Sequence, residues 1–106
     1  MTFYEMLKGY GLQVGYMVLA EQPKFPFLIY LGAGQSTTYA DNAAIYKDNQ
    51  YSIEYYYKTK DEVSEKSFED YLTSQGVAYT KSMDVYIEAE NIYVIYYEVT
   101  RWLTST

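Results

Sequence analysis

Two segments of the chain carry apolar residues at helical spacing, and the first lies near its start. One helical face recurs at the i, i+3, i+4, i+7 spacing and consists of Phe3, Met6, Leu7 and Tyr10. Thr2 and Glu5 form a T-x-x-E capping box, in which each side chain satisfies a free backbone amide of the other residue. Gly11 is a typical C-terminal stop. The pattern therefore predicts a short N-terminal helix that ends at Gly11.

The second and longer helical pattern runs from Asp61 to Gln75. Its apolar stripe consists of Val63, Phe68, Tyr71 and Leu72. Thr59 and Glu62 offer a capping box at its start, and Gly76 supplies its exit. The remaining charged positions of this helix are expected to form a solvated face: Glu62, Glu65, Lys66, Glu69 and Asp70.

Apolar and aromatic runs elsewhere predict strands at 14–19, 27–31, 43–47, 51–58, 77–87 and 92–101. Residues 48–50 have the chemistry of a tight hairpin turn, and a second turn is expected at 89–91. The small and polar stretch from Gly32 to Asn42 predicts a surface loop or the mobile tip of a hairpin.

The order of these elements predicts a single α+β domain over residues 1–106. We expect a mixed, mostly antiparallel sheet, with the short N-terminal helix and one longer helix packed on one face. The succession strand, helix, strand, strand predicts a β-α-β crossover followed by a hairpin. In the strand at 51–58, Ile53, Tyr55 and Tyr57 share the face that is expected to point into the core. The last strand is apolar on both faces, which predicts a central position in the sheet.

Amino-acid composition narrows the possible functions. The 106 residues include 16 tyrosines but no histidine and no cysteine. Tyrosine suits half-buried sheet faces and protein interfaces, because it combines a large ring with a polar hydroxyl. Without histidine and cysteine the chain lacks the commonest general base and the usual zinc ligands. We therefore expect neither an enzyme nor a requirement for a metal or an organic cofactor.

Net charge and the remaining motifs argue against nucleic-acid-binding, nucleotide-binding and membrane proteins. The net charge of −6 has the wrong sign for gripping a nucleic-acid backbone. The Gly-rich stretch LGAGQST lacks the lysine of a phosphate-binding loop. Neither a signal-peptide pattern nor an apolar run of membrane-spanning length occurs. We expect no export by a signal peptide and no membrane partner.

Several motifs follow one another between Phe25 and Val99. A Pro-flanked strand, PKFPFLIYLGAG, leads to YADNAAIYKDNQYSIEYYYKTKDEVSEKSFEDYL, then to SQGVAYTK at the helix exit and to VYIEAENIYVIYYEV. The most telling piece is the stretch 39–42, followed by the tyrosine-rich strand that ends at 58–61 and by the acidic helix. This order resembles the small head-tail joining and tail-completion proteins of long-tailed bacteriophages and prophages of Gram-positive hosts.

The resemblance implies a structural role in a virion. Proteins of this kind include tail terminators, which are small α+β subunits that close into a ring, commonly a hexamer, at the head-proximal end of the tail tube. The ring stops tube growth and joins the tail to the head. The implied partners are further copies of this chain, the tail tube protein and a head-completion or neck protein. DNA is implied only as cargo that passes through the lumen, and the subunit is implied to be made in the cytoplasm of the host bacterium.

The expected interface residues lie in the polar stretch and at aromatic positions: Gly32, Gly34, Thr38, Tyr39, Asp41, Asn42, Tyr56 and Trp102. We expect the loop from Gly32 to Asn42 to be mobile in the free subunit and to become ordered when a neighbour covers it. Two alternatives stay open here. One is a head-side neck protein, either a stopper or an adaptor, and the other is a non-viral, small aromatic-rich domain that binds a ligand or peptide.

Overall fold

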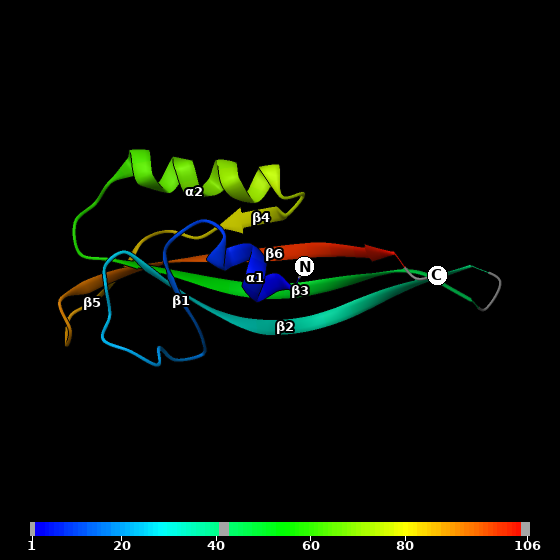
Figure 1. Cartoon of the computed structure of the whole chain (residues 1–106), viewed down its shortest axis with the longest axis horizontal. Coiled ribbons are helices and arrows are strands. Elements are labelled where there is room, and N and C mark those ends of the chain that lie inside the picture. The colour runs from blue at the N-terminus through cyan, green and yellow to red at the C-terminus, as the bar shows by residue number, and fades with distance from the viewer. Residues whose placement is uncertain (1, 41–42, 105–106) are drawn as a thin grey trace.

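The structure, a computed structural model, describes residues 2–40 and 43–104, with the backbone alone described at 36–40, 43–47 and 102–104. Over these residues the elements are α1 (Phe3–Lys8), β1 (Gln13–Tyr16), β2 (Phe27–Ala40), β3 (Ala43–Tyr57), α2 (Glu62–Ser74), β4 (Ala78–Lys81), β5 (Val85–Ile87) and β6 (Ile92–Thr104). Figure 1 shows α2 lying above the sheet and α1 beside it.

The described strands form one six-stranded sheet in the order β1-β2-β3-β6-β4, and β5 pairs with one end of β6. Neighbouring strands run antiparallel, except that β1 and β2 are parallel. Because β6 lies between β3 and β4, its predicted central position is confirmed. The connection from β3 through α2 to β4 is the predicted crossover, and β5 and β6 form the hairpin after it. The predicted α+β fold class, with a mostly antiparallel sheet, is therefore confirmed.

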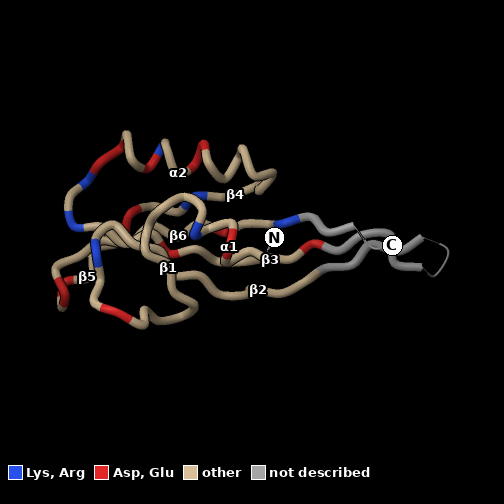
Figure 2. The backbone as a smooth tube through the Cα atoms, viewed as in Figure 1, with Lys and Arg blue, Asp and Glu red and all other residues tan. Residues whose placement is uncertain are grey.

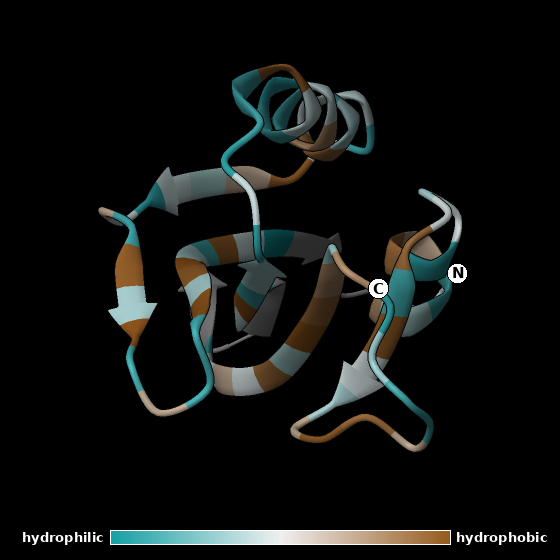
Figure 3. Ribbon diagram, turned by 90° about the vertical axis from the view of Figure 1, so that its left-hand side faces the viewer, coloured by the Kyte–Doolittle hydropathy of each residue, from teal (hydrophilic) through white to brown (hydrophobic). Residues whose placement is uncertain are grey.

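Both helices pack on the same face of the sheet, which curves beneath them (Figure 3). The ring of Phe3 in α1 stacks on Tyr51 of β3, with 3.8 Å between the ring centroids. The ring of Phe68 in α2 contacts Tyr55 and Tyr97. The buried core cluster consists of Phe3, Met6, Leu7, Val14, Leu28, Ile53, Tyr55, Tyr57, Phe68, Leu72, Val77, Ile95, Tyr97 and Val99. The three residues of β3 that were predicted to face the core all belong to this cluster.

Helix α1 begins at the predicted capping box but ends before the predicted stop. The side chain of Thr2 accepts from the amide of Glu5 at 3.1 Å, and the amide of Thr2 donates to the Glu5 carboxylate at 2.9 Å. The C-cap is Gly9 rather than Gly11. Beyond Gly9 the next two amides bond three residues back instead of four, so the last turn tightens and the α-helix stops.

Helix α2 begins with a different cap from the one predicted. Its N-cap is Asp61, whose carboxylate accepts from the amide of Ser64 at 3.2 Å, so the capping box expected from Thr59 and Glu62 is wrong. An aspartate directly before the helix accepts the free amide itself and leaves no cap role for an earlier threonine. The exit at Gly76 is confirmed, since its φ of 74° is a backbone conformation that favours glycine.

The buried face of α2 differs from the predicted stripe at two positions. Phe68 and Leu72 are buried as predicted, and Tyr71 is partly buried. Val63 is 80% exposed, and Glu65, which was placed on the solvated face, is only 2% exposed. The reason is geometric, because Glu65, Phe68 and Leu72 follow one another at the i, i+3, i+7 spacing of a single face.

The stretch from Gly32 to Asn42 is not a loop in its described part, because β2 continues to Ala40. It lies instead in a hairpin, since β2 and β3 pair antiparallel as far as Ala40 and Ala43. Residues 48–50 are likewise not a turn and lie inside β3. Here β3 pairs with β2 on one side and with β6 on the other. Two continuous ladders of backbone hydrogen bonds outweigh the local turn preference of a few polar residues.

Two other strands are shorter than predicted. The run at 77–87 is split into β4 and β5, which pair with separate parts of β6. The first strand ends at Tyr16, because the next residue, Met17, has a φ of 63° that breaks the extended backbone.

Candidate functional site

Three strands continue past both helices as an arm. We define the arm as residues 32–40 of β2, 43–50 of β3 and 100–104 of β6. Figure 1 shows the arm extending beyond α1, α2 and β4. It accounts for the elongated shape of the molecule, which measures 52 by 24 by 24 Å.

Most residues of the arm are small or polar, and its strands are held by backbone pairing. A register shift lies between Gly32 and Gly34, and the φ of 119° at Gly34 favours glycine. Beyond this shift the side-chain amide of Gln35 donates to the side-chain oxygen of Asn49, its partner on β3. Among the arm residues whose side chains are described, 32–35, 48–50, 100 and 101, none belongs to the buried core cluster. These residues are therefore held by the ladders and not by the core.

Both outer edges of the arm are open in the described part of the chain. β1 pairs with β2 only as far as Tyr30, and β4 pairs with β6 only as far as Thr100. Past these points the edges of β2 and β6 have no strand partner among residues 2–40 and 43–104. Unpaired amides and carbonyls along a strand edge are a template for pairing with another chain. The arm is thus the part of the fold best suited to an intermolecular contact.

Most of the residues expected at an interface lie on this arm. Those whose backbone is described there are Gly32, Gly34, Thr38, Tyr39 and Trp102. Trp102 faces Asp48 in the ladder, and Asp48 in turn faces Ser36. Thr38 lies two residues further along β2. Asp41 and Asn42 lie outside the described residues.

Tyr56, the remaining expected interface residue, belongs to the body. It pairs with Phe27 and Val94, far from the arm along β3. Its ring stacks on that of Phe27 at a centroid distance of 4.9 Å, and its hydroxyl donates to the Glu54 carboxylate at 2.7 Å. Burial and this hydrogen bond raise the pKa of Tyr56. The structure therefore does not bring Tyr56 together with the other expected interface residues.

A charged cluster, which the sequence did not predict, holds α2 against the sheet. Its members are Lys60, Glu65, Glu69, Lys81 and Asp84. Glu65 is at the centre, with one carboxylate oxygen 2.8 Å from Lys60 Nζ and the other 3.1 Å from Lys81 Nζ. Lys60 Nζ also lies 2.8 Å from Asp84, and Lys81 Nζ lies 2.8 Å from Glu69. The burial of Glu65 could have been inferred from its position in the sequence, because it lies at helical spacing from the apolar residues Phe68 and Leu72.

Hydrogen bonds within the charged cluster shift the pKa values of its members. Burial works against ionisation of Glu69 and Asp84, but hydrogen bonds from Lys81 to Glu69 and from Lys60 to Asp84 hold both pKa values below their usual range. Burial likewise works against the ammonium groups, but the carboxylates raise the pKa of Lys60 and of Lys81. These four groups are therefore ionised at neutral pH and stabilise one another.

Acid is expected to weaken the fold through Glu69 and Asp84. A carboxyl group with a lowered pKa in the folded state stabilises the fold above its unfolded pKa and loses that contribution as the pH falls through its folded pKa. The ordinary values here are 4.5 and 3.8, and both are lowered. The free energy of unfolding, measured by urea denaturation, should therefore fall below about pH 4.5. Glu69→Gln should reduce this dependence on pH, and an identical profile for the variant and the parent would contradict the assignment.

A second expected result concerns Tyr97, which is fully buried and donates its hydroxyl to the Glu69 carboxylate at 2.7 Å. Tyr97→Phe should lower the free energy of unfolding by about 1.5–3 kcal/mol, the range for a hydrogen bond to a charged group. The control is Tyr79→Phe, since Tyr79 contacts the Tyr97 ring but its hydroxyl makes no hydrogen bond in the described part of the chain. The measurement is urea denaturation of both variants. Equal stability of Tyr97→Phe and Tyr79→Phe would refute the role of this hydrogen bond.

Among residues 2–40 and 43–104, no group of three or more acidic side chains is arranged to hold a metal ion. Nor is any helix in this part of the chain long and apolar enough to cross a membrane. A scan against protein-family models found no match to the chain, and a search of curated proteins found no similar sequence.

Proposed function

We propose that this chain is a tail-terminator subunit of a long-tailed bacteriophage or prophage. It forms a ring, commonly a hexamer in proteins of this kind, at the head-proximal end of the tail tube, stops tube growth and joins the tail to the head. The observation that carries the proposal is the arm, which has two open edges and extends past the layer of helices. The order of motifs between Phe25 and Val99 supports the same role.

A closed ring requires a heterologous interface, in which one patch of a subunit meets a different patch of its neighbour. The arm supplies the first patch. The body offers a second patch at the edge strand β1, whose last residue, Tyr16, is exposed together with the two residues that follow the strand, Met17 and Val18. Large exposed apolar side chains beside an open strand edge suit contact with another chain. We therefore place the arm of one subunit against the β1 region of the next.

The charge of the chain suits a passage for DNA. The net charge is −6, and Figure 2 shows acidic positions along α2. A lumen of like charge does not hold a phosphate backbone, so DNA can slide through it. The remaining partners in the proposal are the tail tube protein on one side and a head-completion or neck protein on the other, within the virion.

Shortening the arm tests the proposal. Residues 38–46 are replaced by Asn-Gly, which joins Thr37 to Lys47, two residues that face each other in the ladder. Because the core cluster formed by the described side chains lies on the body, the shortened chain should still fold. It should nevertheless stay monomeric and fail to cap tubes, whereas the parent forms rings. Sedimentation analysis and electron microscopy of tubes assembled from the tube protein of the same phage measure both properties.

A milder change tests the same surface. Tyr39→Ala should weaken ring formation or tube capping by about 1–2 kcal/mol, as loss of an interface aromatic does. Val63→Ala, on the exposed side of α2, is the control.

Normal capping by the shortened chain would overturn the proposal. Binding to the neck of DNA-filled heads, with no effect on tubes, would instead favour a head-side stopper or adaptor.

A further inference from the structure

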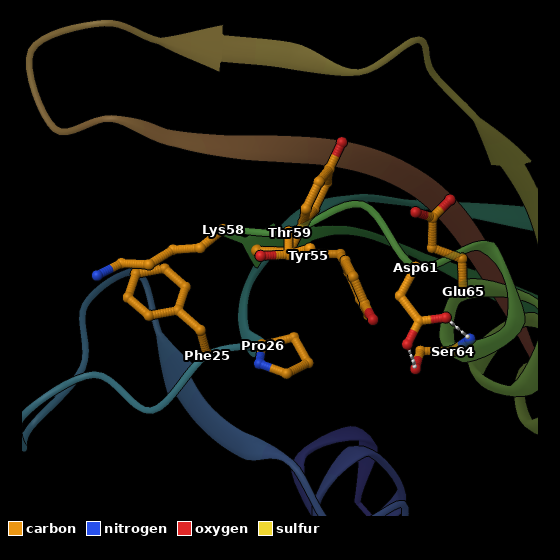
Figure 4. Close-up of a pocket in the computed structure, with 9 residues that line it drawn as sticks. Phe25, Pro26, Tyr55, Lys58, Thr59, Asp61, Ser64 and Glu65 are labelled. Atoms are coloured by element: carbon orange, nitrogen blue, oxygen red, sulfur yellow. Dashed lines mark hydrogen bonds between the residues drawn. The ribbon is translucent and has the colours of Figure 1, made fainter.

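A small pocket opens between the segment that precedes β2 and the start of α2. Its volume is about 190 Å³, and its walls include Phe25, Pro26, Tyr55, Tyr57, Asp61 and Ser64 (Figure 4). The pocket lies on the body and contains none of the arm residues, so it is separate from the surface proposed for ring formation. It combines rings on its walls with polar groups at one end.

The hydroxyl of Tyr55 points into this pocket without a partner. Tyr55 is only 3% exposed, and its hydroxyl makes no hydrogen bond within the described part of the chain. Figure 4 shows the hydroxyl directed into the space between Pro26 and Asp61. Burial raises the pKa of Tyr55 to about 12, so the hydroxyl keeps its proton and remains a donor. The hydroxyl is reached from the pocket, so an acceptor atom of a ligand that occupies the pocket can pair with it.

The charges around the pocket favour a neutral ligand. The Asp61 carboxylate accepts from the hydroxyl of Ser64 at 2.8 Å and from its amide at 3.2 Å, and these hydrogen bonds lower the pKa of Asp61. This ionised carboxylate repels an anion. The ammonium group of Lys58 lies 4.8 Å from the centre of the Phe25 ring, where it repels a cation. Glu65, which also lines the pocket, is neutralised by Lys60 and Lys81.

The size and the walls of the pocket suit one aromatic ring. An engineered protein cavity of about 150 Å³ accepts benzene, so 190 Å³ accommodates a ring with one substituent. Phe25 and Tyr57 supply aromatic walls, against which another ring packs edge-to-face or offset. A phenol hydroxyl both accepts and donates a hydrogen bond, so one oxygen atom pairs with the Tyr55 donor and with the Asp61 acceptor.

We propose that this pocket binds the side chain of a tyrosine that is presented by another protein chain. The proposal does not rest on the function proposed above, because it concerns a separate site and is tested with a free probe. Tyrosine is the residue that meets all three conditions, since it is neutral, aromatic and ends in a group that donates and accepts.

The test is a titration of the full chain with N-acetyl-tyrosinamide, followed by amide shifts in heteronuclear NMR. We expect saturable shifts at Thr59 and Ser64, with a Kd on the order of 1 mM, as for a small ligand without other contacts. N-acetyl-phenylalaninamide, which lacks only the hydroxyl, should bind at least about fivefold more weakly. Equal binding of the two probes, or no saturable shift, would overturn the proposal. Tighter binding of N-acetyl-glutaminamide would overturn it too, because the pocket would then select an amide.

Two variants connect the binding to the proposed contacts. Tyr55→Phe removes a hydroxyl that has no partner within the described residues, so the fold should persist while the preference for the tyrosine probe disappears. Asp61→Asn keeps an efficient helix cap and should weaken binding of the tyrosine probe about threefold, because it removes the charged acceptor. If Tyr55→Phe does not fold, the loss of affinity in Asp61→Asn tests the contact with the hydroxyl of the probe. An unchanged preference in the folded variants would contradict the proposed contacts.

Discussion

Glu65→Ala is expected to lower the free energy of unfolding by about 3 kcal/mol, near the lower end of the range for breaking a buried ion pair. The change removes the central carboxylate of the charged cluster and leaves Lys60 with Asp84 and Lys81 with Glu69 as their remaining partners in the cluster. Both lysine side chains are partly exposed, at 43% and 34%, and this access to water limits the loss. From the sequence alone, a position on the solvated face predicted an effect within about 0.5 kcal/mol. Urea denaturation distinguishes the two values.

Two controls separate the charge of Glu65 from its packing. Glu62→Ala, in the same first turn of α2 but exposed, should change the free energy of unfolding by no more than about 0.5 kcal/mol. Glu65→Gln keeps the shape of the side chain and removes its charge, so it should be nearly as destabilising as Glu65→Ala. A glutamine variant as stable as the parent would show that packing, and not the ion pairs, gives Glu65 its importance.

Phe68→Ala is expected to cost about 3–5 kcal/mol, as truncation of a buried aromatic ring does. Phe68 is fully buried, and its ring lies 5.4–5.7 Å, between centroids, from those of Tyr10, Tyr55 and Tyr97. Its removal therefore opens a cavity between α2 and the sheet that these large rings do not easily fill. Thermal or urea denaturation measures the loss.

The matched control for Phe68 is Val63→Ala on the same helix. Val63 is 80% exposed, so the free energy of unfolding should change by no more than about 0.5 kcal/mol. Comparable losses in the two variants would mean that the buried face of α2 is assigned incorrectly.

Local patterns predicted much of the fold. The capping box at Thr2 and the spacing of the apolar residues predicted α1, and the exit at Gly76 predicted the end of α2. Alternation in β3 identified Ile53 and Tyr55 as core residues. The apolar character of both faces of the last strand predicted its central place. Each of these features depends on neighbours within a few residues, which is the range over which sequence periodicity is informative.

The arm could not be predicted in this way, because its strands are fixed by partners far away in the chain. Residues 48–50 have good turn chemistry when read alone. In the structure, Asp48 is paired with Ser36 on one side and with Trp102 on the other, and this pairing keeps the backbone extended. The stretch from Gly32 to Ala40 is likewise drawn into β2, with the glycines accommodated at a register shift.

The charged cluster could not be predicted either, because it too depends on residues that are far apart in the chain. Glu65 is followed at helical spacing by two apolar residues, but the pattern alone does not supply the cations that make its burial tolerable. Lys60 precedes the helix and Lys81 comes from β4, and both reach Glu65 only when the sheet and α2 have packed together. The expected interface residues, in contrast, were found mostly on one element because they were close together in the sequence.

The position of β6 has a consequence for how the chain is synthesised and folds. β6 follows β3, α2 and β4 in the chain, yet it lies between β3 and β4 in the sheet. While the ribosome is still adding residues 92–104, α2 has only part of its sheet to cover, and the apolar side chains of β3 stay accessible to chaperones. Such long-range pairing forms slowly and late. A partly synthesised chain therefore lacks the third strand of the arm, and any contact that needs the complete arm is withheld until β6 has left the ribosome.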